Sequence, residues 1–226
     1  MKTISYVFSA LLLAMTVAQA QTDPHQQKPK GHPGSSGGGA PHGDMTMASP
    51  GGMTPKQMKD YLRSLLPGKD HEYLAKFVGD WKTVSKIWMT GPDSLPTESE
   101  GTSSAKWILG KRFVEIETTG QLMGQPLDEV MLLGHDNYRN LYTAAYAGSM
   151  GTALLTMTGQ RDPKTGNITM YGEMDEPMLS VTGRMVKYVY SFPDADTIKL
   201  EMFDLHAGDD YKVIEVVFNK VVKSDK

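Results

Sequence analysis

The pattern of apolar and polar positions changes character three times along the chain. Residues 4–17 are mostly apolar, whereas residues 21–54 contain no large apolar side chain other than methionine. Residues 54–77 show apolar positions with helical spacing, and from Trp81 onward apolar and polar residues alternate. Because successive side chains of a strand point to opposite faces, this alternation predicts β-strands that each bury one face.

Two short helices are expected before the alternating region. In the stretch TPKQMKDYLRSLLPG, Thr54 can cap a helix that has Pro55 at its first position, and Pro67-Gly68 ends it. Its apolar positions are Met58, Tyr61, Leu62 and Leu65. A second short helix is expected from His71 to Phe77, where Tyr73, Leu74 and Phe77 share one face.

About ten strand-like runs follow, separated by turn formers such as Gly91-Pro92-Asp93 and Pro193-Asp194-Ala195-Asp196. No helix-length segment lies between them, so consecutive strands should be antiparallel neighbours. An open sheet of this size would leave two unpaired edges, which a closed barrel avoids. The pattern therefore predicts an all-β fold: an antiparallel up-and-down β-barrel of about ten strands with a short N-terminal helical segment.

The N-terminal sequence MKTISYVFSALLLAMTVAQA has the parts of a secretory signal. Lys2 provides a positive charge before the apolar stretch, and Ala18-Gln19-Ala20 offers the small residues that a signal peptidase requires. The stretch is too short for a stable membrane span. We therefore expect residues 1–20 to be removed by cleavage after Ala20 and the protein to be periplasmic or secreted.

Residues 21–54 are expected to be a disordered linker, which leaves residues 55–226 as the barrel domain. A segment rich in Gly, Pro, Ser and His cannot bury enough surface to offset its ordering entropy. It contains the possible copper ligands His25, His32, His42, Met45, Met47 and Met53. Their spacing is irregular, so a flexible linker explains them and no metal site is predicted.

Composition excludes several classes of function. The chain has no cysteine, which rules out thiol catalysis, thiolate metal sites and disulfides. Its net charge is −3 and no run of basic residues follows the signal, which argues against nucleic acid as a partner. No cofactor is predicted, and the sequence does not indicate an oligomeric state.

The stretch GHDNYRNLYTA, residues 134–144, raises the question of a catalytic cluster. Asp136 and Asn137 are typical turn residues, so a hairpin between two strands explains them without catalysis. The predicted barrel contains no nucleophile-elbow motif and no H-E-x-x-H motif that could use His135 or His206. The sequence therefore favours a non-catalytic protein over an enzyme.

Four motifs carry a resemblance to a known family. The triplet GDW at 79–81 resembles the G-x-W signature of lipocalin and calycin barrels. With ILGKRF at 108–113, GQPLDEVMLLGHDN at 124–137 and FNK at 218–220, the chain is similar to a bacterial domain family of unknown function placed among the calycins. The resemblance spans roughly residues 70–222 and implies a lipocalin-like barrel, but it brings no known activity.

The resemblance also implies roles for two residues. Trp81 should close one end of the barrel, and Lys220 should stack on it by a cation–π contact. The chain departs from the family pattern at Lys111, which replaces a glycine and puts the shape of that turn in doubt, and at His135, which replaces a tyrosine.

Alternation inside a barrel assigns the inner faces. In the first strand Lys82 and Lys86 should face water, and the inner residues are expected to be Trp81, Thr83, Ser85, Ile87 and Met89. Further inner faces are expected at Val114 and Ile116, at Tyr142, Ala144 and Tyr146, and at Arg184, Val186, Tyr188 and Tyr190. For the tyrosines, ordinary strand packing is an alternative explanation.

Such faces would enclose an apolar cavity with phenol groups and one guanidinium. This suits a small hydrophobic or amphipathic ligand whose acidic head group binds Arg184 or Arg112 and whose tail lies among aromatic side chains and Met202. The candidate ligand-binding residues are therefore Trp81, Arg112, Tyr142, Tyr146, Arg184, Tyr188 and Met202.

Two other functions remain open. One is a haem- or metal-dependent enzyme or sensor that uses His135 or His206, although both lie near strand ends rather than at internal axial positions. The other is an interaction domain whose barrel is filled by its own side chains and which binds a partner through an exposed apolar patch.

Overall fold

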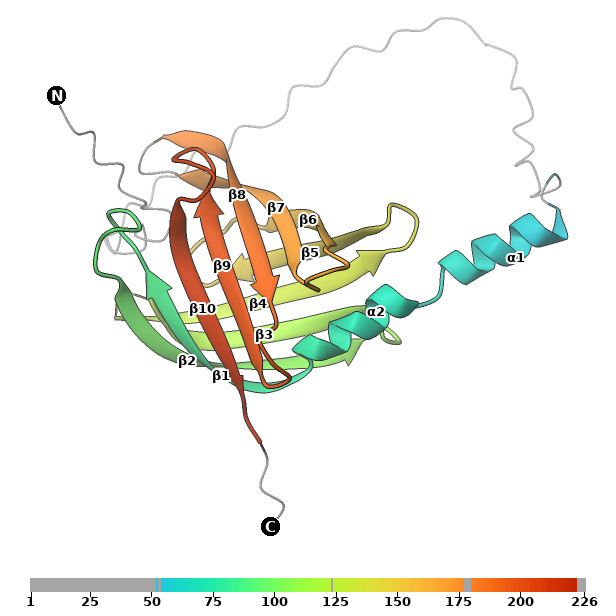
Figure 1. Ribbon diagram of the computed structural model, residues 1–226, viewed down its shortest axis with the longest axis horizontal. Helices are drawn as coiled ribbons and strands as arrows, with labels where there is room; N and C mark the ends of the chain where they lie inside the picture. Colours follow the sequence, from blue (N-terminus) through green and yellow to red (C-terminus); the bar gives the residue numbers. More distant parts are fainter. Residues whose placement is uncertain (1–51, 53, 123, 177–179, 223–226) are drawn as a thin grey trace, which may run out of the picture.

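The computed structural model of the chain describes residue 52 and residues 54–122, 124–176 and 180–222. The expected signal peptide and almost all of the expected linker, including its histidine and methionine candidates for copper, lie outside these residues. Within the described ranges, helices precede a run of strands, and none of these helices is long and apolar enough to cross a membrane (Figure 1).

The helical segment follows the sequence prediction. Helix α1 spans Pro55–Ser64, and Thr54 caps it: the amide of Gln57 donates to Thr54 Oγ1 at 3.3 Å while the amide of Thr54 donates to Gln57 Oε1 at 2.8 Å. Helix α2 spans Lys69–Tyr73 and continues into a 3₁₀ helix, η1, at Leu74–Phe77. The single second helix expected from the sequence is therefore two short pieces.

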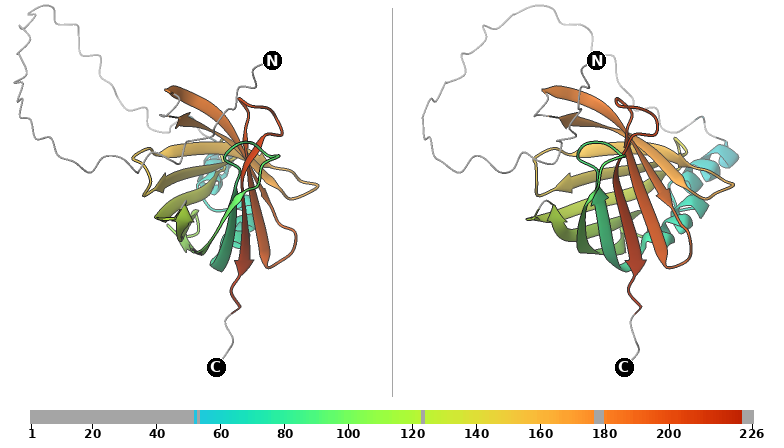
Figure 2. Two further views of the ribbon diagram at one scale, coloured as in Figure 1. Left: turned by 90° about the vertical axis from the view of Figure 1, so that its left-hand side faces the viewer. Right: turned by 60° about the vertical axis from the view of Figure 1, so that its left-hand side comes forward.

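Ten strands follow, and they close into a barrel, which confirms the predicted fold. Their bounds are β1 Gly79–Ile87, β2 Thr97–Ile108, β3 Phe113–Leu122, β4 Gln125–Asp136, β5 Leu141–Gly148, β6 Leu155–Arg161, β7 Ile168–Glu176, β8 Val181–Ser191, β9 Thr197–Asp204 and β10 Lys212–Lys220. Each strand pairs antiparallel with the next, and β1 also pairs with β10, so the barrel has no free edge (Figures 1 and 2).

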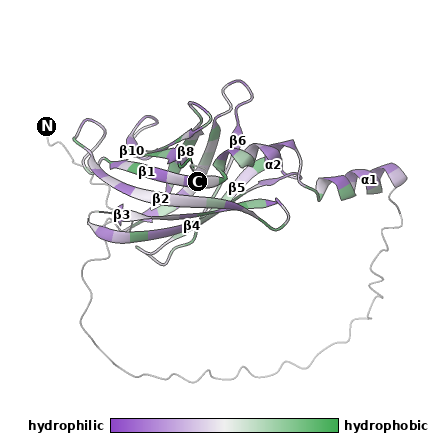
Figure 3. Ribbon diagram, turned by 90° about the horizontal axis from the view of Figure 1, so that it is seen from below, coloured by the Kyte–Doolittle hydropathy of each residue, from purple (hydrophilic) through white to green (hydrophobic). Residues whose placement is uncertain are grey.

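Hydrophilic and hydrophobic residues are interspersed along the strands, as Figure 3 shows for β2, β3 and β4. In β1, Trp81 and Thr83 are buried while Lys82 is exposed, as the sequence predicts. In β3, Val114 and Ile116 are buried and Glu117 is exposed. The core is therefore the set of inward side chains of all ten strands.

The segment α2–η1 covers one end of the barrel, which we call the closed end (Figure 1). Leu74 and Phe77 of η1 are buried in the core. Trp81 is 2% exposed, and its Nε1 donates to the carbonyl of Phe77 at 2.8 Å. Lys220 Nζ lies 5.5 Å from the centre of the Trp81 ring, which confirms the expected cation–π contact.

The stretch at 134–144 comprises the end of β4, the hairpin turn at 137–140 and the start of β5, at the closed end of the barrel. Asp136 Oδ1 accepts the amide hydrogens of Tyr138 and Arg139 at 2.8 and 3.0 Å, as a turn aspartate should. The side chain of Asn137 donates to the carbonyls of Ser64 and Leu66, at 3.0 and 2.8 Å. This turn therefore serves the fold, because it holds the end of α1 against the barrel.

Candidate functional site

A cavity of about 180 Å³ lies inside the barrel. All ten strands and η1 contribute side chains to its wall, and it extends from Phe77 and Trp81 toward the opposite end, which we call the far end. An apolar cavity of roughly 150 Å³ is large enough to bind benzene. The space inside this barrel is therefore sufficient for a compact small molecule.

Most of the cavity wall is apolar. Aliphatic and aromatic groups come from nearly every strand, among them Ile116, Leu122, Leu200, Val216 and Phe218. Four methionines also line it: Met131, Met157, Met174 and Met202. Because a methionine side chain is unbranched and polarizable, it adapts to a ligand at low energetic cost.

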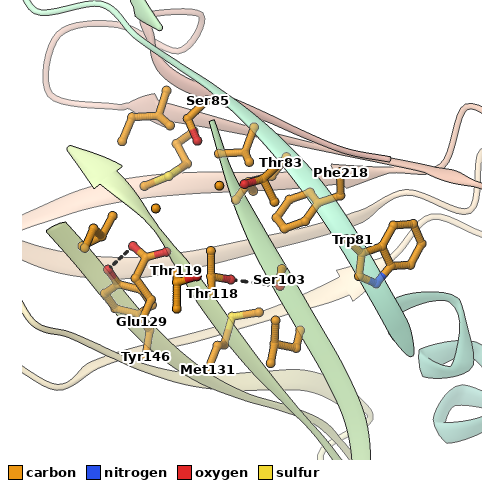
Figure 4. Close-up of a pocket in the computed structure, with 18 of the residues that line it drawn as sticks. Trp81, Thr83, Ser85, Ser103, Thr118, Thr119, Glu129, Met131, Tyr146 and Phe218 are labelled. Carbon is orange, nitrogen blue, oxygen red and sulfur yellow. Dashed lines mark hydrogen bonds between the residues drawn. The ribbon is translucent and has the colours of Figure 1, made fainter. Parts of the chain in front are cut away.

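A patch of hydroxyl groups covers the wall formed by β1, β2 and β3. It consists of Thr83, Ser85, Ser99, Ser103 and Thr118. Thr119 contributes only its backbone, because its hydroxyl bonds Thr102 on the exposed face at 3.1 Å. Thr118 donates to Ser103 Oγ at 3.0 Å across the β2–β3 pair (Figure 4). A Cβ at Gly101 would lie 2.5 Å from the carbonyl oxygen of Thr119 and 2.8 Å from Thr83 Oγ1, so only glycine fits at this point of the wall.

One carboxyl group, that of the half-buried Glu129 on β4, belongs to the inner cavity wall. Tyr146 of β5 donates to Glu129 Oε1 at 2.6 Å (Figure 4). Burial raises the pKa of Glu129, and the hydrogen bond from Tyr146 opposes this shift without cancelling it. In the described part of the chain, Glu129 Oε2 has no hydrogen-bond partner, so this oxygen is available to a ligand.

Three tyrosines line the same cavity as this carboxyl group. Burial raises the pKa of Tyr146, Tyr188 and Tyr190, with Glu129 as a further cause for Tyr146 and Tyr190, so all three phenols stay neutral at ordinary pH. Tyr190 donates to the sulfur of Met131 at 3.7 Å. The hydroxyl of Tyr188 has no hydrogen-bond partner among the residues that the structure describes.

The cavity wall contains acidic groups but no basic ones. Glu129 and Glu100 are its acidic residues, but Glu100 is exposed and alternates along β2 with the inward-facing Ser99 and Gly101. No lysine, arginine or histidine occurs among the described residues that line it. The electrostatic character of the interior therefore disfavours an anionic ligand.

Four of the candidate residues from the sequence line the cavity: Trp81, Tyr146, Tyr188 and Met202. The other three, Arg112, Tyr142 and Arg184, do not. Glu129 and the hydroxyl patch were not among the candidates. The alternation in LDEVMLL contained the signal for Glu129, because Leu127, Glu129 and Met131 share one strand face.

Arg112 lies in the β2–β3 turn at the closed end. Its guanidinium donates to the carbonyls of Leu109 and Leu65, at 3.3 and 3.1 Å. Arg112 therefore fastens the residues after α1 to the barrel and does not reach the interior. Lys111 beside it has a φ of 63°, the left-handed backbone that a glycine adopts without strain.

Tyr142 points inward but lies beneath α2, outside the cavity. Its hydroxyl donates to Asp70 Oδ1 at 3.1 Å, and Arg161 Nη2 donates to the same oxygen at 3.2 Å. Burial raises the pKa of Asp70, but the hydrogen bonds from Arg161 and Tyr142 outweigh it and the net shift is downward. Tyr142 therefore anchors α2.

Arg184 is internal rather than solvated, and it forms a buried ion pair with Asp204. The same aspartate accepts the amide hydrogen of His206 at 3.1 Å, and its own amide donates to the carbonyl of Tyr211 at 3.0 Å. The guanidinium is thus committed to the β9–β10 turn at the far end. The acidic head group expected from the sequence has no arginine to bind in the cavity.

The two histidines considered for haem or metal lie at opposite ends of the barrel. His135 contacts His71 and Tyr142 at the closed end, with ring centres 5.7 and 5.0 Å apart, and His206 lies in the β9–β10 turn. Neither lines the cavity. Across the described ranges, no group of three or more histidine, cysteine, aspartate or glutamate side chains could hold a metal ion.

These features define the class of protein: a closed ten-stranded antiparallel β-barrel with a largely apolar internal cavity. A family model described as "Protein of unknown function (DUF1579)" matches residues 66–220, and the chain belongs to this family. A comparison with curated proteins finds no match.

Comparison with solved structures finds several barrels. Rv2717c from M. tuberculosis matches with 15% identity and a TM-score of 0.48, over 69% of this chain and 99% of that one. The S-type phycobiliprotein lyase CPES from Guillardia theta matches with 10% identity and a TM-score of 0.43, over 74% and 98% of the two chains. A redesigned β-barrel matches with 11% identity and a TM-score of 0.35, over 66% of this chain and 96% of that one.

Proposed function

We propose that this protein is an exported, calycin-like carrier that binds a small, predominantly apolar molecule inside its barrel and does not catalyse a reaction. The observation that carries the proposal is the cavity of about 180 Å³ with its mostly apolar wall. Export is supported by the signal-like residues 1–20, which end in Ala18-Gln19-Ala20.

The form of the cavity supports ligand binding over the alternative of an interaction domain with a filled barrel. Close packing normally leaves few voids larger than a water molecule, whereas this barrel encloses a much larger one. A binding pocket typically combines an apolar wall with a few placed polar groups. Here the polar groups are the hydroxyl patch on β1–β3 and the Glu129–Tyr146 pair.

The chemistry of the wall supports binding without catalysis. A serine or threonine becomes a nucleophile when a neighbouring base accepts its proton. Thr118 donates to another hydroxyl, that of Ser103, and the described lining residues include no histidine or lysine that could act as that base. Glu129 accepts a hydrogen bond from Tyr146, and no hydroxyl of the patch donates to it in the described residues.

The test is a titration of the ¹⁵N-labelled mature protein with toluene, followed through amide chemical shifts. We expect saturable shifts in the strands that line the cavity. Leu200→Trp places a larger side chain into the cavity and should abolish them, whereas Leu132→Trp, at an exposed position on β4, should leave them intact. Saturable shifts that survive Leu200→Trp, or no shifts in the wild type, would contradict the proposal.

A further inference from the structure

We propose that the ligand carries an amine, bound as its ammonium ion by the Glu129–Tyr146 pair. This inference rests on the proposed function above and names the chemical class of its ligand. It reverses the polarity expected from the sequence, which was an acidic head group held by an arginine.

The first argument is the geometry of the pair. Tyr146 and Glu129 lie on neighbouring strands, where Tyr146 pairs with Met131, two residues along β4 from Glu129. The 2.6 Å hydrogen bond from the phenol uses Oε1 and fixes the orientation of the carboxyl group. Oε2 accepts no hydrogen bond from any residue that the structure describes, so it is left for a donor on the ligand.

The second argument is charge. The described lining residues include two acids and no lysine, arginine or histidine. Glu129 lies within the barrel, and Glu100 is exposed. A ligand carboxylate would therefore find no cationic partner and would repel ionised Glu129 in an environment of low dielectric constant. An ammonium ion would meet a carboxylate and could donate a charge-assisted hydrogen bond, the stronger kind.

The third argument is the aromatic surroundings. Tyr188 and Tyr190 line the same space, and the electrostatic influence of Glu129 reaches the Tyr190 phenol. Aromatic faces attract cations, most strongly where water is excluded. The hydroxyl of Tyr188, which has no hydrogen-bond partner in the described ranges, adds a further acceptor to the cavity wall.

Binding of an ammonium ion is expected to release a proton. Burial raises the pKa of Glu129, whereas an ammonium ion beside the carboxyl group would lower it, so binding at a pH near that pKa should displace the carboxyl proton. When the ammonium binds, the carboxyl proton passes to the buffer and the carboxylate pairs with the ligand. The ligand keeps its own proton, and no covalent bond changes.

The experiment uses three probes of one shape: benzylamine, toluene and benzoate. For the wild type we expect benzylamine to bind about tenfold more tightly than benzoate, which corresponds to one charge-assisted hydrogen bond. Glu129→Gln should weaken the affinity for benzylamine by about tenfold and change the affinity for toluene by less than about twofold. Asp128→Asn, the adjacent exposed acid on β4, is the matched control and should leave all three affinities unchanged.

Calorimetry in two buffers of different ionisation enthalpy measures the number of protons released when a probe binds. Benzylamine should release a fraction of a proton from the wild type and none from Glu129→Gln. If toluene binds but benzylamine is no tighter than benzoate, or is unaffected by Glu129→Gln, this inference fails and the proposed function stands. If none of the three probes binds, both fail.

Discussion

The phenol of Tyr146 donates a 2.6 Å hydrogen bond to Glu129 inside the barrel. Carboxyl groups are rarely buried without a partner, because desolvation of the charged form is unfavourable. Tyr146 supplies that partner while leaving the second carboxyl oxygen unused. The pair therefore gives a mostly apolar cavity one polar point of attachment.

Tyr146→Phe is expected to destabilise the fold. The substitution removes the hydrogen-bond donor of a buried carboxyl group, and leaving such an acceptor without its partner costs about 1–3 kcal/mol. Urea denaturation measures the free energy of unfolding. The control is Tyr171→Phe, which removes a hydroxyl from a half-exposed tyrosine on β7 and should change the free energy of unfolding by less than about 0.5 kcal/mol.

The raised pKa of Glu129 predicts a pH dependence of stability. The folded protein holds this proton more tightly than the unfolded chain, whose glutamate titrates near 4.5. The contribution of Glu129 is therefore fully present below that value and is lost as the pH rises through the folded-state pKa. Asp70 acts oppositely, because its pKa is lowered: its contribution is present above its ordinary value of 3.8 and lost on acidification.

The measurement compares unfolding free energies of wild type and Glu129→Gln between about pH 4 and pH 8. The stability of the wild type relative to the variant should fall as the pH rises. Asp128→Asn should follow the wild-type curve. Parallel curves for wild type and Glu129→Gln would show that Glu129 titrates as it does in the unfolded chain.

Lys111→Gly is expected to stabilise the protein. Lys111 has a φ of 63°, which strains any residue with a Cβ. Glycine relieves that strain, although its greater conformational entropy favours the unfolded chain. The net effect should be an increase of about 0.5–1 kcal/mol in the free energy of unfolding. Lys111→Ala keeps the Cβ, so an equal gain from alanine would refute the backbone explanation.

Asn137→Ala is expected to loosen α1 without unfolding the barrel, although Arg112 still holds the carbonyl of Leu65. The Asn137 side chain holds the carbonyls of Ser64 and Leu66, and few residues of α1 are otherwise covered. Amide hydrogen exchange should speed up in Pro55–Ser64 and stay unchanged in the strands. Asn219→Ala, at an exposed position on β10, should alter neither.

The sequence was sufficient for the parts of the fold that depend on local pattern. Alternation in β1 correctly placed Trp81, Thr83 and Lys82, because a strand that buries one face must separate apolar from polar side chains. The helix at Thr54 was equally well marked by its cap and by Pro55. Strand pairing then followed from the short turns and the absence of a free edge.

The composition of the site was harder to predict, because it depends on position along each strand. Tyr142 and Tyr146 share an inner face, yet α2 covers the first and the cavity opens beside the second. Arg184 points inward, but Asp204 on the next strand neutralises it. Glu129 was not predicted: it follows another acid, Asp128, and only the alternation of the strand places one of the two inside.

The most direct test of the account is a crystal structure of the protein soaked with benzylamine. The account predicts density for one molecule inside the barrel, with its ring against the methionines and its nitrogen within hydrogen-bond distance of Glu129 Oε2. An interior filled by ordered water or by rearranged side chains, with benzylamine only on the outer surface, would contradict it.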